Sequence, residues 1–261
     1  MKTVKQAQLK KDSKKHWYRF KTFARNGAVA AFSTRRFRMN FTSEGSRSLV
    51  VAHRKHFCKL VGVPFEGLVS LEQVHGGHIV RVRKEDCGKG ARNLADVLRA
   101  SDAAITNCPD VVLSIRSADC APIFLLDPVH HAIGIAHVGW KGASERLTSK
   151  MVQAFRHQFL SRPANLIVGL GPMIHSCCYE VGEEFRDVFG SFVTKRKQSY
   201  FFNLKGWVID DLLAEGVEQE KIYDTAFCTS CLVDQFPSYR REGARVRHML
   251  SIIQLKPKEK E

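Results

Sequence analysis

Residues 103–170 carry the pattern that most limits what this chain can fold into. Four short apolar runs separated by turn residues have the length and composition of β-strands: Ala103–Thr106, Val111–Ile115, Pro122–Leu126 and Ala132–Val138. Apolar residues then recur every fourth position from Leu147 to Phe159, as on the buried face of an amphipathic helix. Another apolar run, Asn165–Leu170, follows. Strand 132–138, helix 144–160 and strand 165–170 therefore predict a βαβ unit.

The flanking sequence continues the mixture of strands and helices. Strands are expected at Ala28–Phe32, His78–Val82, Lys221–Phe227 and Ser251–Leu255, and helices at Arg47–Val61 and Trp207–Ala214. The chain has 261 residues and no internal repeat, which favours one large domain. We expect a mixed α/β (α+β) fold with a mixed β-sheet core flanked by helices. The expected catalytic domain spans residues 21–255, between a basic flexible tail (1–20) and a charged tail (256–261).

The positive charge of the chain is concentrated at its beginning. The formal net charge is +15, and residues 1–38 hold twelve Lys or Arg and one acid, Asp12. Such a segment can make weak contacts with nucleic acid. The alternative is a solvated tail that only keeps the protein soluble. We favour the solvated tail, because no nucleic-acid-binding motif follows the basic segment.

The location expected for this protein is the cytoplasm. No apolar run approaches the roughly 20 residues of a membrane span, and the first twenty residues lack the apolar stretch of a secretory signal. The chain has eight cysteines. In a long chain without an export signal, these are expected to be reduced thiols.

Three separated motifs offer a set of metal ligands. Gln73-Val74-His75-Gly76, Ser117-Ala118-Asp119-Cys120 and Ala136 to Gly142 supply two imidazoles and one thiol, from His75, Cys120 and His137. All three lie at predicted strand–loop junctions, where sites are commonly built. Two nitrogens and one sulfur suit zinc and leave one coordination position open. The alternative is two hydrogen-bonded structural histidines and a cysteine that fills apolar space.

The residues around these motifs resemble the YfiH/laccase-domain family, whose members are described as polyphenol oxidases or as purine nucleoside phosphorylase-like. Six blocks match in family order across roughly residues 27–255. They are Leu71–Gly76; Ser101–Ala103 with Ser117–Pro122; Ala136–Gly142; Gly169–Ile174; Cys177–Gly182; and Cys228–Cys231 with Phe236, Ser238–Arg241 and Gly243. The fold that the resemblance implies is similar to the one predicted above.

The resemblance implies a zinc enzyme acting on purine nucleosides. The reactions would be phosphorolysis of adenosine, inosine or methylthioadenosine with inorganic phosphate, and hydrolytic deamination of adenosine. Zn²⁺ would be held by His75, Cys120 and His137. Asp119 would orient a ligand or act as a base, although a loop cap is an equal alternative. Arg240 and Arg241, with Arg35 and Arg36, are candidates for phosphate contacts, or else make surface or structural ion pairs.

Three other functions remain open. A copper polyphenol oxidase is disfavoured, because a multicopper centre usually has repeated His-x-His and none of the 11 histidines forms that pattern. A hydrolase could use Cys120 as nucleophile and His137 as base, as in relatives that cleave a peptidoglycan-precursor amide. The third is a non-enzymatic nucleic-acid binder that uses the basic segment.

The chain departs from the family pattern in two places and holds one further motif of uncertain role. Lys141 stands where the family usually has Arg, so a cation remains without the bidentate fork. The loop Thr34–Asn40 is shortened, which would change a substrate pocket if that loop closes it. Cys228-Thr229-Ser230-Cys231 is a C-x-x-C motif, which alone suggests redox or zinc chemistry, but no second C-x-x-C lies nearby and the adjacent Cys177 and Cys178 should point apart. Cys228, Cys231 and Cys177 are therefore expected to fill packing space or line a substrate wall.

Overall fold

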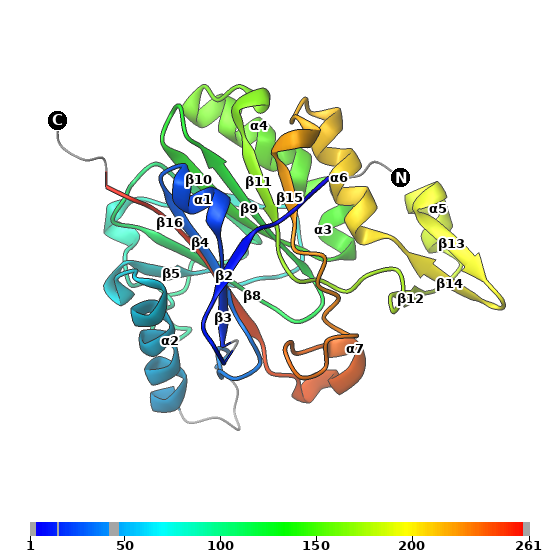
Figure 1. The fold of residues 1–261 in the computed structure, drawn as a ribbon, viewed down its shortest axis with the longest axis horizontal. Helices are drawn as coiled ribbons and strands as arrows, with labels where there is room; N and C mark the ends of the chain where they lie inside the picture. Colours follow the sequence, from blue (N-terminus) through cyan, green and yellow to red (C-terminus); the bar gives the residue numbers. More distant parts are fainter. Residues whose placement is uncertain (1–3, 15, 42–46, 258–261) are drawn as a thin grey trace.

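The structure is a computed structural model that describes residues 4–14, 16–41 and 47–257. Within this part of the chain, two sheets pack face to face and helices cover their outer faces (Figure 1). The mixed α/β single-domain architecture expected from the sequence is confirmed. The order of layers is α2, six-stranded sheet, seven-stranded sheet, and α4 with α6.

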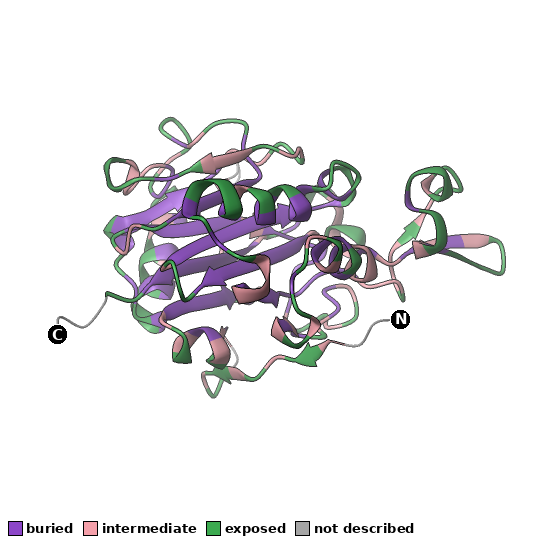
Figure 2. Ribbon diagram, turned by 90° about the horizontal axis from the view of Figure 1, so that it is seen from above, coloured by how far each residue is buried: buried purple, intermediate pink, exposed green. Residues whose placement is uncertain are grey.

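The seven-stranded sheet has the order β1-β15-β11-β9-β10-β7-β6 and mixes parallel and antiparallel pairs. Its strands are β1 (Lys5–Gln6), β15 (Ile222–Asp224), β11 (Ile167–Leu170), β9 (Ala121–Asp127), β10 (Ala132–Val138), β7 (Ala103–Thr106) and β6 (Ile79–Arg81). Every residue of β9 and β10 is buried, because both faces of these strands are covered, and this explains their almost unbroken apolar sequences (Figure 2).

The six-stranded sheet has the order β2-β3-β4-β16-β8-β5. Its strands are β2 (Leu9–Lys11), β3 (Trp17–Phe20), β4 (Ala28–Ser33), β16 (Met249–Leu255), β8 (Val112–Ser117) and β5 (Leu68–Ser70). Aromatic rings such as Phe20, Phe32 and Phe124 fill the space between the two sheets. Two elements distant in sequence, β4 and β8, both pair with β16 in the middle of the sheet.

The helices cover the outer faces. On the six-stranded sheet, α2 (Arg47–Val61) buries Phe57 and Val61, and its bounds are those that the sequence predicts. On the seven-stranded sheet lie α4 (Leu147–Phe159) and α6 (Leu204–Ala214), with the short α3 (Trp140–Ser144) leading into α4. Shorter helices are α1 (Lys21–Arg25), α5 (Phe185–Phe189) and α7 (Tyr239–Glu242).

The predicted βαβ unit is present with two differences. Strands β10 and β11 are both antiparallel to β9, so they run parallel to each other with β9 between them. The helix expected over 144–160 is α4, which begins three residues later, and a separate short helix, α3, precedes it. The break falls at Arg146, whose φ of 57° is left-handed. Its Nε lies 2.6 Å from the buried Asp211 Oδ1, an ion pair that holds the break in place.

The expectation of a flexible basic tail over residues 1–20 is wrong for the part that the structure describes. Strand β3 pairs with β4, and it buries Trp17, Tyr18 and Phe20. Strand β1 pairs with β15 at the edge of the other sheet. Three of the positive charges that suggested a tail, those of Lys5, Lys10 and Lys11, lie on exposed positions of β1 and β2, while the apolar side chains of β3 enter the core.

Lys256, directly after β16, makes two contacts with the segment around α1. The backbone N–H of Lys256 donates to the Gly27 carbonyl at 2.8 Å, and its Nζ donates to the Ala24 carbonyl at 2.7 Å. The remainder of the expected charged tail, residues 258–261, lies outside the described residues. None of the helices in the described ranges is long and apolar enough to cross a membrane.

A small arm that the sequence did not suggest projects from the body of the molecule (Figures 1 and 2). It contains α5 and a three-stranded sheet made of β12 (Glu180–Val181), β14 (Ser199–Phe202) and β13 (Val193–Arg196). Phe185 at its base contacts Trp140 of α3, with ring centroids 5.4 Å apart. The arm therefore reaches the same end of the seven-stranded sheet as the His137 motif.

Candidate metal centre and substrate cavity

The fold brings His75, Cys120 and His137 together. His75 lies on the loop after β5, Cys120 lies between β8 and β9, and His137 lies near the end of β10. One ligand atom from each lies within 4.8 Å of the others. His137 is buried, Cys120 is half-buried and His75 is exposed, so the group opens to solvent on the His75 side. Two nitrogens and one sulfur in this arrangement form a three-ligand set with one free side.

Asp102 ties two of these three segments together. Its buried carboxylate accepts a hydrogen bond from His137 Nδ1 at 2.9 Å. It also accepts from the backbone N–H groups of Val74, His75 and Gly76, at 3.0, 3.0 and 2.8 Å. The ring nitrogen that faces the group is therefore Nε2 of His137, and the His75 loop is held by the same carboxylate. Carboxylates of this kind orient histidine ligands of metals.

Charge in this group favours the thiolate of Cys120. Burial raises the pKa of the thiol, but the neighbouring imidazoles of His137 and His75 outweigh burial and lower it to about 6. The pKa of His137 is shifted in the opposite directions. Burial lowers it, whereas the negative charges of Cys120 and Asp102 raise it. The thiolate is the form of cysteine that binds metals.

The backbone conformation around the three ligands explains why the motifs have His at position 75 and Asp at position 119. His75 has φ of 63° and Asp119 has φ of 89°, and His and Asp tolerate this left-handed region better than most residues. Gly139 is needed for a different reason. A Cβ at this position would lie 2.8 Å from Cys120 Sγ and 3.5 Å from His75 Cδ2. Only glycine leaves the space that the thiol occupies.

The group lies in a cavity of about 710 Å³. Its wall has an aromatic part, formed by Trp140, Tyr179, Phe185 and Tyr239. It also has a cationic part, formed by Arg116, Lys141 and Arg240. The arm contributes Val181 and Phe185 to this wall. A cavity of this size can enclose a small organic molecule, and its lining offers stacking surfaces next to positive charge.

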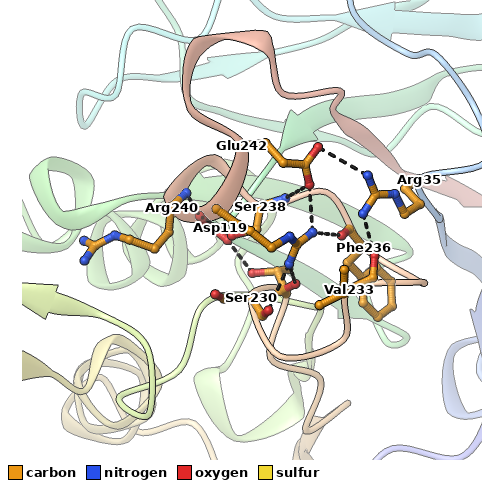
Figure 3. A network of polar contacts seen from close by, with 10 residues as sticks. Arg35, Asp119, Ser230, Val233, Phe236, Ser238, Arg240 and Glu242 are labelled. Carbon is orange, nitrogen blue, oxygen red and sulfur yellow. Dashed lines mark hydrogen bonds and ion pairs between the residues drawn. The ribbon is translucent and has the colours of Figure 1, made fainter.

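Asp119 lines the same cavity, but its carboxylate faces the chain rather than the three ligands. It accepts hydrogen bonds from Thr229 Oγ1 at 2.5 Å, from Ser238 Oγ at 3.0 Å and from the Arg240 backbone N–H at 2.7 Å (Figure 3). These donors come from the two C-terminal motifs. Asp119 therefore joins the Cys120 loop to the segment that carries Arg240, which supports a positioning role rather than that of a base.

The four candidate arginines separate into two classes. Arg240 lines the cavity, where its Nη2 donates to the Glu180 carbonyl at 2.6 Å. Arg241 points into the fold and donates to the carbonyls of Thr229, Ser230 and Phe236, and to Glu242. Arg35 contacts Glu242 and the Val233 carbonyl (Figure 3). The cavity lining does not include Arg241, Arg35 or Arg36. Of the four candidates, Arg240 is therefore the one placed where a substrate anion could bind.

The shortened loop Thr34–Asn40 also stays away from the cavity lining. It instead holds the buried Arg54, whose guanidinium donates to the Met39 carbonyl at 2.7 and 3.1 Å. Lys141 does line the cavity, and its Nζ lies 5.6 Å from the Trp140 ring centroid.

Sequence reasoning missed two basic residues of the cavity, Arg116 and His248. Burial lowers the pKa of Arg116, and burial together with Arg116 lowers the pKa of His248 to about 4. Arg116 ends β8, where its backbone N–H and carbonyl both pair with the Gln73 side chain. Gln73 opens the His75 motif and Arg116 directly precedes the Ser117–Cys120 motif, but neither motif marks the Arg116 side chain as part of the cavity.

The structure also corrects the expectation for the remaining cysteines. Cys177, Cys178, Cys228 and Cys231 converge, with one sulfur from each within 4.8 Å of the others. The side chains of Cys177 and Cys178 do not point apart, because residues 176–178 form a turn instead of an extended strand.

Comparison with known proteins identifies the family. A family model described as "Multi-copper polyphenol oxidoreductase laccase" matches residues 19–256. The chain belongs to this family. The match includes all three proposed ligands and the C-terminal segment that Asp119 holds.

Relatives and solved structures agree with this assignment. The purine nucleoside phosphorylase YlmD of Geobacillus stearothermophilus is 32% identical over 87% of this chain and 90% of its own. The Bacillus subtilis protein of the same name is 30% identical over 79% of this chain and 77% of its own. The crystal structure of the Geobacillus protein covers 96% of this chain and all of its own with a TM-score of 0.90 at 30% identity. A Bacillus licheniformis protein, YfiH, gives the same TM-score at 26% identity, over 95% of this chain and 99% of its own.

Proposed function

We propose that this chain is a zinc-dependent purine nucleoside phosphorylase that acts on adenosine, inosine and methylthioadenosine with inorganic phosphate. One observation carries the proposal: the open His75–Cys120–His137 group shares its cavity with an aromatic wall and with cations. The names of the relatives support the reaction class. The eight free thiols suit a reducing cytoplasm, where such a substrate would be met.

The donor set fits zinc. Two imidazoles and a thiolate are borderline-soft ligands that zinc prefers, and Asp102 fixes the His137 ring so that Nε2 faces the group. A multicopper centre needs many more histidines. Among the residues that the structure describes, His75 and His137 are the only histidines in a potential metal-binding group. Zinc bound there supplies a Lewis acid with a free coordination position.

The aromatic wall is suited to a purine base. Trp140 and Phe185 contact each other at 5.4 Å between ring centroids, and Tyr179 lies on the Arg240 side, 5.8 Å from that guanidinium. A flat heterocycle can stack on such rings. Burial and the Cys120 charge raise the pKa of Tyr179 above its ordinary value, so its hydroxyl remains a hydrogen-bond donor.

Arg116 and Arg240 are the groups proposed to bind phosphate. Arg116 is largely withdrawn from water, and a desolvated guanidinium attracts an anion more strongly than an exposed one. Arg240 is held through its backbone by Asp119 and through Nη2 by Glu180, which leaves other N–H groups for an oxyanion. The two arginines would orient phosphate toward the sugar and offset the repulsion between its oxygens and the thiolate.

The test is incubation of zinc-loaded protein with adenosine, inosine and methylthioadenosine, each with and without phosphate. We expect a phosphate-dependent release of free base and of the pentose 1-phosphate. The Cys120→Ala variant should be inactive, and Cys108→Ala, a thiol outside the cavity, is the matched control. Absence of pentose 1-phosphate from all three nucleosides would overturn the proposal. Formation of inosine from adenosine without phosphate would instead assign deamination to this site.

A thiol hydrolase is the competing use of the same residues. It requires Cys120 as a free nucleophile, and coordination of zinc by its sulfur would remove that nucleophilicity. Amide hydrolysis that persists after zinc removal, and that is lost on alkylation of Cys120, would favour the hydrolase over the phosphorylase.

A further inference from the structure

A second group of potential metal ligands lies outside the cavity. Cys177 and Cys178 come from the turn before β12, and Cys228 and Cys231 come from the segment after β15, about fifty residues later. The sulfur–sulfur distances are 3.6 Å for Cys177–Cys228, 3.5 Å for Cys177–Cys231 and 3.4 Å for Cys178–Cys231. All four sulfurs lie within 4.8 Å of one another.

These distances are close to those of a tetrahedral tetrathiolate. A zinc–sulfur bond of about 2.3 Å puts neighbouring sulfurs of a tetrahedron roughly 3.8 Å apart. Packing alone does not require four thiols from two distant segments to lie this close together. Two thiols on a C-x-x-C turn and two on a second turn give the four corners of the tetrahedron.

The surroundings also suit bound thiolates. The backbone N–H of His175 donates to Cys228 Sγ at 3.5 Å, a contact that stabilises negative charge on sulfur. The group contains four sulfurs and no carboxylate or imidazole, which selects a soft metal ion such as zinc. With four protein ligands, no coordination position is left for a substrate. The chemistry is that of a structural site, in contrast to the open His75–Cys120–His137 group.

We propose that Cys177, Cys178, Cys228 and Cys231 bind a second zinc ion as a closed tetrathiolate. Each thiol releases its proton to solvent when the ion binds, so the loaded site carries a net charge of about −2. The ion links two segments that build the substrate cavity. Tyr179 and Glu180, directly after Cys178, line the cavity, and Thr229, directly after Cys228, holds Asp119. The second zinc thus fixes the wall of the cavity without contacting the substrate.

The first test is metal stoichiometry. Elemental analysis of the full-length protein, purified under reducing conditions, should give two zinc ions per chain. The double variant Cys178→Ser/Cys231→Ser should retain one, and Cys120→Ala should lose the other. The double variant Cys87→Ser/Cys108→Ser, which changes two thiols outside both groups, is the matched control and should keep two. One zinc in the wild-type protein, with all of it lost in Cys120→Ala, would overturn the proposal.

The second test needs no variant, so a folding defect cannot obscure it. Protein stripped with a chelator is titrated with Co²⁺, and the visible spectrum is followed. A tetrathiolate should add an intense sulfur-to-metal absorption distinct from that of a two-nitrogen, one-sulfur site. In the zinc-loaded protein, the four cysteines should resist alkylation and become reactive after chelation. Rapid alkylation of these four in zinc-loaded protein, or a disulfide among them after purification under reducing conditions, would refute the second site.

Discussion

At the scale of single residues, Asp102 is the group on which the proposed catalytic site most depends. It has no exposed surface, and it accepts hydrogen bonds from His137 and from the His75 loop. Asn at this position keeps the shape of the side chain, but it removes the negative charge and presents an N–H to one of the present donors. Two of the three proposed ligands therefore lose their support in one substitution.

We expect Asp102→Asn to weaken zinc binding at the His75–Cys120–His137 group by about 10- to 100-fold. Competition with a zinc chelator measures the affinity, and zinc bound by the four-cysteine site is subtracted by using a Cys120→Ala reference. An affinity equal to that of the wild-type protein would mean that Asp102 only supports the loop.

Gly139 gives a second residue-scale prediction, based on space. An added Cβ would meet Cys120 Sγ at 2.8 Å, so Gly139→Ala should displace the thiol and lower both zinc occupancy and nucleoside turnover. Gly142→Ala, three residues later in α3, places its Cβ no closer than 3.4 Å to a neighbouring atom and is the matched control. Equal zinc content in the two variants would contradict this account.

The residues of the site differ in how far sequence could reveal them. His75, Cys120 and His137 were identifiable because each lies in a distinctive motif, and the fold brings them together. Arg116, just before the Ser117–Cys120 motif, and His248, just before β16, have no motif of their own, and the pairing of β8 with β16 brings them to the same end of the sheet. Asp119 was correctly placed at the cavity, but its partners come from over a hundred residues away and no local pattern encodes them.

At the scale of elements, α7 places two adjacent arginines in different environments. Arg240 faces the cavity, and Arg241 holds three backbone carbonyls of the preceding loop. We expect Arg240→Ala to slow phosphorolysis on the order of a hundredfold while both zinc ions stay bound. Steady-state kinetics at varied phosphate concentration measure the effect, with Arg186→Ala on the exposed arm as the control. Unchanged kinetics would remove Arg240 from the phosphate site.

Arg241→Ala should act on stability instead. It removes the guanidinium donor of three carbonyls, while Glu242 keeps its contacts with Arg35 and the Ser238 N–H, so the free energy of unfolding should fall by about 1–3 kcal/mol. Chemical denaturation measures this change. If Arg241→Ala matched wild-type stability but lost activity, the roles assigned to the two arginines would be reversed.

The sequence predicts best those elements in which one pattern of apolar residues continues from the first residue to the last. Strands β7 and β10 and helix α2 have the predicted bounds, because long apolar runs or a helical stripe continue through them. The arm was missed, because its strands are only two or four residues long: β12 and β13 are mostly exposed, and the alternation of β14 rests on just two buried residues, Tyr200 and Phe202. The break between α3 and α4 was missed for another reason: it depends on the tertiary ion pair of Arg146 with Asp211.

At the scale of the whole molecule, the first twenty residues belong to the folded body. Phe20 of β3 lies 5.3 Å from Phe124 of β9 between ring centroids, and it thereby connects the two sheets. We expect Phe20→Ala to lower the free energy of unfolding by about 3–5 kcal/mol. Lys10→Ala on exposed β2 should stay within about 0.5 kcal/mol of the wild-type protein. Thermal or urea unfolding compares them, and a small effect of Phe20→Ala would restore the tail interpretation.

Weak nucleic-acid binding by the basic N-terminal segment is the less favoured interpretation of its charge, and it can be tested. If it occurs, charges on β1 and β2 are responsible, and affinity for a mixed-sequence duplex should fall steeply with salt. Replacement of Lys5, Lys10 and Lys11 by Gln tests this without removing β3 from the core. Binding that is insensitive to both salt and these substitutions would exclude the segment as the contact.

The position of β16 in the middle of its sheet has a consequence for biosynthesis. Residues 249–255 pair with β4 on one side and β8 on the other, so a nascent chain that has emerged only as far as residue 248 lacks the strand that joins these two. Until then, β4 and β8 expose unpaired edges that can associate with other chains. The six-stranded sheet can therefore close only after residue 255 has emerged from the ribosome, and until then a shorter product risks misassembly through these edges.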